Sequence, residues 1–340
     1  SLSSFGLQED KLQTAVSGAL MRYLIDTQKN SLSHIKKIFV KSNRETMLLD
    51  ASTFRNLELV KNIRDGSNRG SLLGILDKST TALGSRLLRK WLKEPLLKQQ
   101  LIERRLNAVE ALNKNIISRE DIVTLLKNVY DIERLIGRVN YGTANPRDLL
   151  SLKSSLQQIP LLKSKLSDFS SELLTSIGNM PELGSVSELI NNSIKDEAPI
   201  TIREGGMIKT SYNSELAELH AIKTNSKAYL QEIENKEKER TGILSLKIRF
   251  TRVFGYFIEV TKKNVPFVPN DYIRKQTTTN SERYITEELK TVEEKILGAQ
   301  EKIQELEYRL FQEIVEKIAE KTIEMQDAAG KISVLDVLCS

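Results

Sequence analysis

Apolar residues recur at helical spacing over two long and otherwise polar stretches of the chain. From residue 287 onward they alternate at intervals of three and four, the spacing of a coiled-coil seam, at Leu289, Val292, Ile296, Ala299, Ile303, Leu306 and Leu310. Residues 213–240 carry a thinner stripe, at Leu216, Leu219, Leu230 and Ile233. At about 1.5 Å per residue, the two helices would be roughly 40 and 50 Å long. Because helices this polar cannot both be buried, we expect them to pack on each other as a projecting arm.

The same period predicts further helices before the arm. Residues 8–30 and 80–92 each form one helical stretch, and residues 98–195 form a succession of helices separated by turn signals. Pro146 suits the first position of a helix, and Asn145 before it suits the N-cap.

Three smaller features lie outside this pattern. Residues 38–60 favour a short strand followed by a helical turn. Residues 198–212 predict a small hairpin that turns at Gly205–Gly206. Trp91 is expected in the core, beside the leucines of its own helix, and not as a binding platform.

Near the end of the chain the period changes from helical to alternating. Strands are predicted near residues 245–252 and 255–261, with a turn around Val253–Phe254. A second pair of strands, "RKQTTT" and "RYIT", would turn at Asn280–Ser281. The predicted fold class is therefore mainly α: a helical core whose long lever helices form an arm, capped by a small four-stranded antiparallel β unit.

These changes of period also predict the domain organisation. Residues 1–240 would form the helical core and the outgoing lever helix. Residues 241–286 would form the β unit as an insertion, and residues 287–340 the returning lever helix and the end of the core.

Composition fits a helix-rich soluble protein. The 340 residues are 39% apolar and 28% charged, with only 16 Gly and 7 Pro, which argues against disorder and against a β-sandwich. The sequence shows no run of apolar residues long enough for a membrane span and no signal peptide at its start, so no membrane partner is expected. One cysteine, Cys339, fits a reducing, cytoplasmic location, and with only two histidines beside it the sequence argues against a zinc site.

Positive charge gathers in the alternating segment. The chain has a net charge of +6. Residues 246–285 hold three acids against eight basic residues, a net +5: Glu259, Asp271 and Glu282 against Lys247, Arg249, Arg252, Lys262, Lys263, Arg274, Lys275 and Arg283. A run of charge is most often a solvated surface, but its coincidence with the predicted strands favours an acidic partner.

The sequence lacks the motifs of catalysis. Gly330–Lys331 is followed by Ile332 and has no glycine five residues earlier, so it is not a phosphate-binding loop. Dinucleotide, zinc-protease and serine-hydrolase motifs are also missing. Acidic residues occur mainly with lysines at i,i+4 spacing, as on solvated helix surfaces. We therefore expect no catalytic residue, cofactor or metal in this chain and no enzymatic activity of its own.

Seven strings, spread over almost the whole chain, are specific enough to compare with known families. They are "SLLGILDKSTTALGSRLLRKWLKEPL" (71–96), "TANPRDL" (143–149), "REGGMIKTSYNSEL" (203–216), "KERTGILSLKIRF" (238–250), "FGYFIEVTKKN" (254–264), "YIRKQTTTNSERYITEELK" (272–290) and "LDVL" (335–338). In this order they resemble the MutS family of bacterial DNA mismatch-recognition proteins.

The resemblance implies a fragment of a longer protein. It would hold the family's domain III, an all-α core with levers, and domain IV, a small β clamp inserted in that core. A mismatch-reading domain would precede residue 1, and an ATPase domain that uses ATP and magnesium would follow Ser340. The full-length protein would be a homodimer with double-stranded DNA and a MutL-type repair protein as partners. The clamp segment argues against the related MutS2 proteins, which lack it, whereas meiotic relatives outside mismatch repair stay possible.

The resemblance also implies which residues bind DNA. The family's clamp grips the duplex backbone without reading its sequence, because phosphate contacts carry no base information. The predicted DNA-binding residues are, in order of preference, Lys262, Lys263, Arg274 and Lys275, then Arg249, Arg252 and Arg283, with neutral hydrogen bonds from Thr278, Thr279 and Asn280.

Two other hypotheses remain open on the sequence. A coiled-coil arm could present its β tip to a protein partner, in which case DNA binding with a strong salt dependence is not expected. Alternatively, the arm could bind RNA, with Phe254, Tyr256 and Phe257 as stacking platforms, and would then prefer single strands to a duplex.

Overall fold

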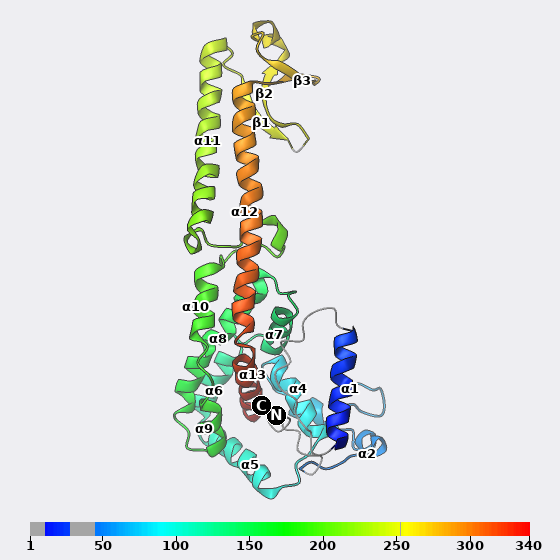
Figure 1. Ribbon diagram of the computed structural model, residues 1–340. Coiled ribbons are helices and arrows are strands. Elements are labelled where there is room, and N and C mark those ends of the chain that lie inside the picture. The colour runs from blue at the N-terminus through cyan, green and yellow to red at the C-terminus, as the bar shows by residue number, and fades with distance from the viewer. Residues whose placement is uncertain (1–10, 28–44, 252) are drawn as a thin grey trace. The chain divides into compact units, whose positions relative to one another are not determined.

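The computed structural model describes residues 11–27, 45–251 and 253–340 (Figure 1). The chain divides into two compact units, one of residues 1–191 and 313–340 and the other of residues 192–312. The described residues form many helices and one four-stranded antiparallel sheet. The predicted fold class, mainly α with a small β unit, is therefore confirmed.

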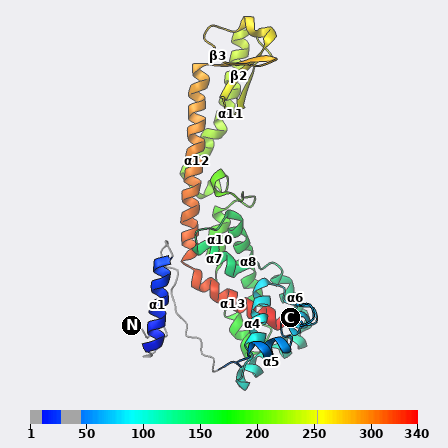
Figure 2. The same ribbon diagram turned by 90° about the vertical axis from the view of Figure 1, so that its right-hand side faces the viewer.

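The first unit consists of helices and the loops that join them. They are α1 (Lys11–Thr27), α2 (Ala51–Asn56), α3 (Leu72–Leu76), α4 (Ala82–Lys93), α5 (Gln99–Lys114), α6 (Ile116–Leu126), α7 (Ile132–Asn140), α8 (Pro146–Leu166), α9 (Glu172–Gly178), α10 (Gly184–Ser193) and α13 (Thr322–Cys339). The last of these, α13, packs against α4, α5, α6, α7 and α9 (Figure 2), and many of its side chains are buried. The helices predicted for residues 8–30, 80–92 and 98–195 are confirmed within the described residues.

N-terminal caps explain where helices of this unit begin. Asn145 and Asp148 form a capping box, in which each side chain accepts a hydrogen bond from the other residue's backbone N–H. Pro146 is the first residue of α8. The predicted start of this helix is therefore confirmed.

A buried carboxylate of α13 fixes the start of α4. Asp336 is 1% exposed and accepts hydrogen bonds from the backbone N–H groups of Thr80 and Thr81, at 2.9 and 2.8 Å, and from the Thr81 hydroxyl at 2.6 Å. A Cβ atom added to Gly84 would lie 2.2 Å from Asp336 Oδ2, so this close approach requires glycine. Two of the seven strings, 71–96 and 335–338, meet at this contact.

Two local predictions for this unit are corrected. Of the strand predicted within residues 38–60, the described part shows only an isolated bridge between Thr46 and Leu96, while the helical turn is present as α2; residues 38–44 lie outside the described residues. Trp91 is half-buried and not part of the core, because the guanidinium of Arg105 covers its ring at 3.4 Å from the centroid. Burial lowers the pKa of Arg105 to about 10.

Two antiparallel helices form the arm of the second unit. These are α11 (Ser214–Thr241) and α12 (Glu287–Ala319), which lie side by side in both views (Figures 1 and 2). Ion pairs join them toward both ends of α11, Lys236 to Glu288 at 2.9 Å and Arg309 to Glu215 at 3.7 Å. Most of the predicted seam is buried, namely Leu216, Ile233, Leu289, Ile296, Ala299, Ile303, Leu306 and Leu310. Ion pairs thus join the two helices, while their packing on each other along the whole seam stays a prediction.

The hairpin predicted for residues 198–212 is wrong. This segment contains two short 3₁₀ helices, η2 (Ile202–Glu204) and η3 (Thr210–Tyr212), and an isolated bridge between Ile194 and Ile208. The backbone N–H groups of Gly206 and Ile208 donate to the carboxylate of Glu307 on α12, which is fully buried. The backbone of the segment is thus satisfied partly by this side chain of the arm and partly by hydrogen bonds with Ser193 and Lys195, and not by a hairpin of its own.

The sheet follows the predicted strands and turns. Its strands are β1 (Lys247–Thr251), β2 (Gly255–Thr261), β3 (Ile273–Thr277) and β4 (Ser281–Ile285), in the order β1-β2-β4-β3, with the 3₁₀ helix η4 (Lys262–Phe267) between β2 and β3. All neighbouring pairs are antiparallel. The predicted domain boundaries stay a prediction, because the two compact units group the chain by packing and divide it after Asn191 and after Gln312.

Candidate nucleic-acid interface

One face of the sheet packs on the arm. Its side chains join a buried cluster with residues of both helices. The strand members of the cluster are Ile248, Tyr256, Ile258, Val260, Tyr284 and, at the end of β4, Ile285. Two carboxylates of the arm also hold strand backbone: Glu234 accepts from the N–H of Ile248 at 2.8 Å, and Glu293 accepts from the N–H of Tyr256 at 3.0 Å. These contacts fix which face of the sheet is turned away from the arm.

The other face of β1, β2 and β4 is here called the polar face. It carries Lys247, Glu259 and Arg283 in register across the three strands, and Arg249 two residues after Lys247 on β1. Arg249 Nε lies 2.9 Å from Glu259 Oε2 and remains largely exposed. Arg283 is half-buried, with its guanidinium 4.5 Å from the Phe257 ring centroid and a 2.6 Å hydrogen bond to Gln276. Of the two predicted arginines on this face, Arg249 is therefore the more accessible to a phosphate.

Four predicted residues come together at one end of the sheet. The backbone N–H of Lys262 donates to the carbonyl of Asn280 at 3.2 Å, which joins the start of η4 to the turn between β3 and β4. The side chains of Lys262, Lys263, Thr279 and Asn280 are exposed. Neither lysine makes an ion pair with any described residue. We call these four residues the basic end.

Arg274 and Lys275 lie on β3, an edge strand. A β-bulge follows Arg274, and Lys275 is its extra, exposed residue, without an ion pair to the described part of the chain. Arg274 lies 3.7 Å from Glu282, and its register partner Tyr284 belongs to the packed face. Arg274 is therefore on the face opposite to the polar face.

Two predicted residues remain, Thr278 and Arg252. The Thr278 hydroxyl donates to the carbonyl of Ser281 at 2.8 Å and accepts from the N–H of Ser281 at 3.1 Å. Its hydrogen bonds therefore stabilise the turn between β3 and β4. Arg252 lies outside the described residues. The nine predicted residues that the structure describes thus form separate groups and not one continuous surface.

The aromatic residues of the first hairpin are mostly used for packing. Phe257 is 1% exposed, and Tyr256 is half-buried against the cluster with its ring centroid 4.9 Å from that of Phe250. Only Phe254, of the three predicted stacking residues, is exposed, at 37%. The three rings therefore do not form a platform for successive bases.

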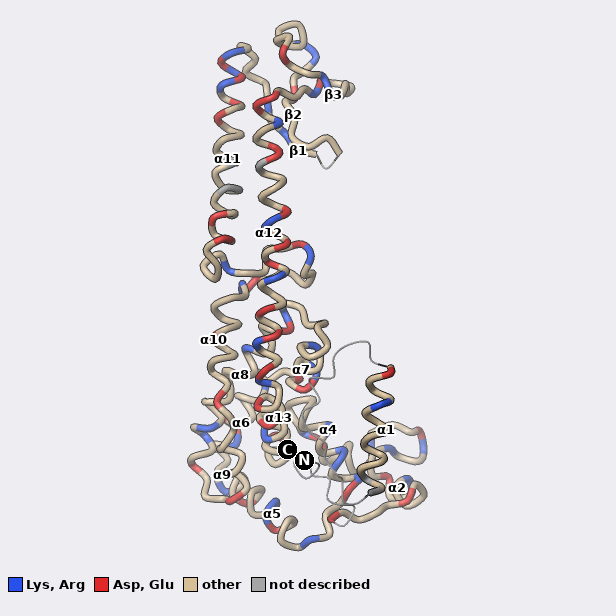
Figure 3. Tube along the Cα trace, viewed as in Figure 1, with Lys and Arg blue, Asp and Glu red and all other residues tan. Residues whose placement is uncertain are grey.

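Net charge alone does not distinguish the sheet from the rest of the chain. Basic residues lie along both units (Figure 3). Residues 51–93 are net +6, with acids Glu58, Asp65 and Asp77 against Arg55, Lys61, Arg64, Arg69, Lys78, Arg86, Arg89, Lys90 and Lys93. All of these basic residues except Arg86 are exposed, and those exposed ones make no ion pair within the described residues. The net charge of the whole chain hides this stretch, because the residues outside both basic regions are net negative.

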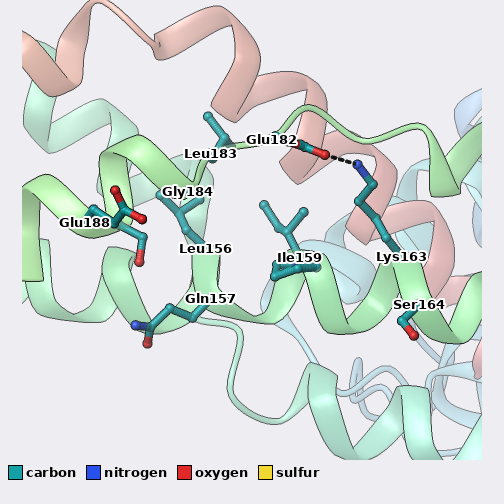
Figure 4. Close-up of a pocket in the computed structure, with 11 residues that line it drawn as sticks. Leu156, Gln157, Ile159, Lys163, Ser164, Glu182, Leu183, Gly184 and Glu188 are labelled. Atoms are coloured by element: carbon teal, nitrogen blue, oxygen red, sulfur yellow. Dashed lines mark hydrogen bonds and ion pairs between the residues drawn. The ribbon is translucent and has the colours of Figure 1, made fainter.

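A pocket of about 690 Å³ lies between α8 and the start of α10 in the first unit (Figure 4). Its apolar lining includes Leu156, Ile159 and Leu183, and an ion pair of 3.4 Å joins Lys163 to Glu182 at its rim. Its lining includes no histidine or cysteine. Among the described residues, no group of three metal-ligating side chains could hold an ion, and no helix is both long and apolar enough to cross a membrane.

Comparison with known proteins places the chain in a family. Residues 52–340 match the family described as MutS domain III. Similar proteins named DNA mismatch repair protein MutS come from Ruminiclostridium cellulolyticum (48% identity over 99% of this chain and 39% of that protein), Caldanaerobacter subterraneus (46%, over 98% and 39%) and Myxococcus xanthus (44%, over 100% and 38%). The chain spans about 39% of the length of these relatives. The chain belongs to the MutS family.

Proposed function

We propose that this chain is the lever and clamp part of a DNA mismatch repair protein and holds duplex DNA through its phosphate backbone. The observation that carries the proposal is the set of exposed, unpaired lysines on the small sheet, Lys262, Lys263 and Lys275, in a chain whose relatives are named for mismatch repair. The arm supports the sheet through its carboxylates and its packed cluster.

The chemistry of the basic end suits a grip that ignores sequence. Lysine ammonium groups are point charges that neutralise phosphates of any nucleotide, and phosphate contacts position a protein without reading bases. The exposed Thr279 and Asn280 add neutral hydrogen-bonding groups beside them. A protein that must hold any duplex during inspection needs contacts of this kind.

The activity of the whole protein is part of the same proposal. The full-length protein would be a homodimer that hydrolyses ATP with magnesium, acts with a MutL-type partner and works in the cytoplasm. The present residues would supply none of the catalytic groups, so the isolated chain should not hydrolyse ATP.

A second candidate is a protein-binding tip. It is favoured by exposed apolar side chains on and around the sheet, because Val253, Phe267 and Ile273 are 82%, 67% and 57% exposed. Exposed apolar groups are common on soluble proteins but also mark protein interfaces. Duplex binding that weakens steeply with salt would favour the first proposal over this one.

Titration of the chain with duplex DNA at several salt concentrations tests the proposal. We expect dissociation constants on the order of 10⁻⁴ to 10⁻⁶ M, typical of non-specific contacts. Three neutralised phosphates would give a log–log slope of about −2.7 with salt. Matched and mismatched duplexes should bind alike. Lack of binding, or binding that salt does not weaken, would contradict the proposal, and a preference for single-stranded RNA would favour the RNA-binding hypothesis.

A further inference from the structure

Glu259 is the single acid among the charged residues of the polar face. Its Cα partners are Lys247 on β1 and Arg283 on β4, and its carboxylate forms the 2.9 Å ion pair with Arg249. The Ser281 hydroxyl donates to its other oxygen at 3.1 Å. Three basic residues therefore surround one carboxylate, whose side chain is 22% exposed.

The carboxylate of Glu259 lies among these basic residues in the way that a bound phosphate group would. Arginine binds carboxylates and phosphates through the same N–H groups and with similar geometry. Arg249 is 59% exposed, so a phosphate can reach it from solvent. Because its Nε already lies against Glu259, a phosphate that binds there must compete with that carboxylate and also meets its negative charge.

We propose that Glu259 is an internal counter-ion that competes with DNA phosphates for Arg249 and so keeps the hold of the sheet on DNA weak and reversible. The inference rests on the proposed function, since it names a residue that limits affinity at the same surface. The pair of Arg274 with Glu282 is longer, at 3.7 Å, and lies on the other face, so its effect on affinity is expected to be smaller.

The test is the duplex affinity of Glu259→Gln, which removes the charge and keeps the shape of the side chain. We expect affinity to rise about two- to fivefold, the range that exposed ion pairs are worth. The log–log slope with salt should become steeper by about 0.9, because one more phosphate is neutralised. The matched control is Glu287→Gln, which removes the same charge from the largely exposed first turn of α12 and should change affinity less.

A double-mutant cycle separates direct competition from a general effect of charge. In the background of Arg249→Gln, the gain from Glu259→Gln should shrink, because the arginine that it frees is gone. If Glu259→Gln does not fold, as judged by circular dichroism, single variants still test the idea. Arg249→Gln should then cost less affinity than Lys262→Gln, since Lys262 has no carboxylate to displace within the described residues.

The outcomes distinguish this inference from the proposed function. If the unchanged chain does not bind duplex in a salt-dependent way, the proposed function fails. If it binds and Glu259→Gln binds equally or more weakly, Glu259 orders Arg249 and does not compete with DNA, and the inference is overturned. Equal losses for Arg249→Gln and Lys262→Gln would overturn it as well.

Discussion

Gly255, directly after the first turn of the sheet, has a φ of +68°, a conformation that side chains of L-residues rarely adopt. A Cβ atom added there would lie 1.7 Å from Glu293 Oε1, the carboxylate oxygen that also accepts from the N–H of Tyr256. The glycine thus permits both the turn and the close approach of the arm. The sequence indicated the turn, but it held no sign of the partner, which lies 38 residues later on α12.

Gly255→Ala is therefore expected to destabilise the sheet. The strained φ and the contact with Glu293 should together lower the free energy of unfolding by about 1–3 kcal/mol. Gly298→Ala on α12 is the control, because no atom lies within 4 Å of its added Cβ and alanine favours a helix. Urea unfolding of both variants measures the difference, and equal stability of the two would contradict the role given to Gly255.

Asp336 predicts a pH dependence of stability. Burial raises the pKa of this carboxyl above its ordinary value of 3.8, although hydrogen bonds from Thr80 and Thr81 oppose the shift. The folded protein thus keeps the proton to a higher pH than the unfolded chain. The stabilisation from this group is complete below the ordinary pKa and is lost as pH rises through the raised pKa.

Asp336→Asn removes this titration. The stability of the unchanged chain relative to the variant should therefore fall as the pH is raised from about 4 to about 7. Urea unfolding of both proteins across this range provides the measurement. A relative stability that grows with pH would mean that the hydrogen bonds from Thr80 and Thr81 outweigh burial.

The helices and strands were predictable where one period runs through a whole element. The seam of α12 repeats at intervals of three and four, and the β-branched and aromatic residues of β2 stand apart from the helical sequence around them, and both elements are present. The structure of residues 198–212 was not predictable, because backbone N–H groups of this segment bond to Glu307, about a hundred residues away in sequence. Local patterns contain no information on such a partner.

The candidate site shows the same limit. Alternation cannot place Arg274 and Lys275 on a face of the sheet, because the bulge between Arg274 and Gln276 breaks the period of two. The same pattern gives no indication that the Thr278 hydroxyl bonds within the turn between β3 and β4. It also does not indicate that Arg283 packs on Phe257. The sequence predicts a basic sheet. It does not predict which of the basic side chains are exposed to a DNA phosphate.

The seam of the arm leads to a prediction about stability. Ile303 is 2% exposed on α12, so Ile303→Ala should lower the free energy of unfolding by about 2–5 kcal/mol through lost contacts and a cavity. Leu297→Ala in the same helix is the control, because this side chain is 41% exposed and should cost less than about 1 kcal/mol. Denaturant unfolding followed by circular dichroism should separate the two. Equal costs would mean that the seam does not hold the arm.

For the whole molecule, the main question is which of two basic regions binds DNA. Residues 246–285 and residues 51–93 have similar positive excess. Electrostatic attraction to DNA is not specific, so charge alone would favour both. Exposed lysines without ion pairs occur in both regions, so the proposal favours the sheet because of the clamp that the family resemblance implies there.

Charge reversal in matched variants tests this choice most directly. One variant changes Lys262, Lys263, Arg274 and Lys275 to Glu, and the other changes Lys61, Arg64, Arg69 and Lys78 to Glu. All eight side chains are exposed and lie outside the helical seam, and both variants shift the net charge equally. Circular dichroism and unfolding should be similar to those of the unchanged chain.

The decisive measurement is the duplex affinity of these two variants at one low salt concentration. We predict that the sheet variant loses measurable binding, while the variant at residues 61–78 stays within about threefold of the unchanged chain. If the sheet variant binds as tightly as the unchanged chain, or if only the variant at residues 61–78 loses binding, the sheet is not the DNA clamp.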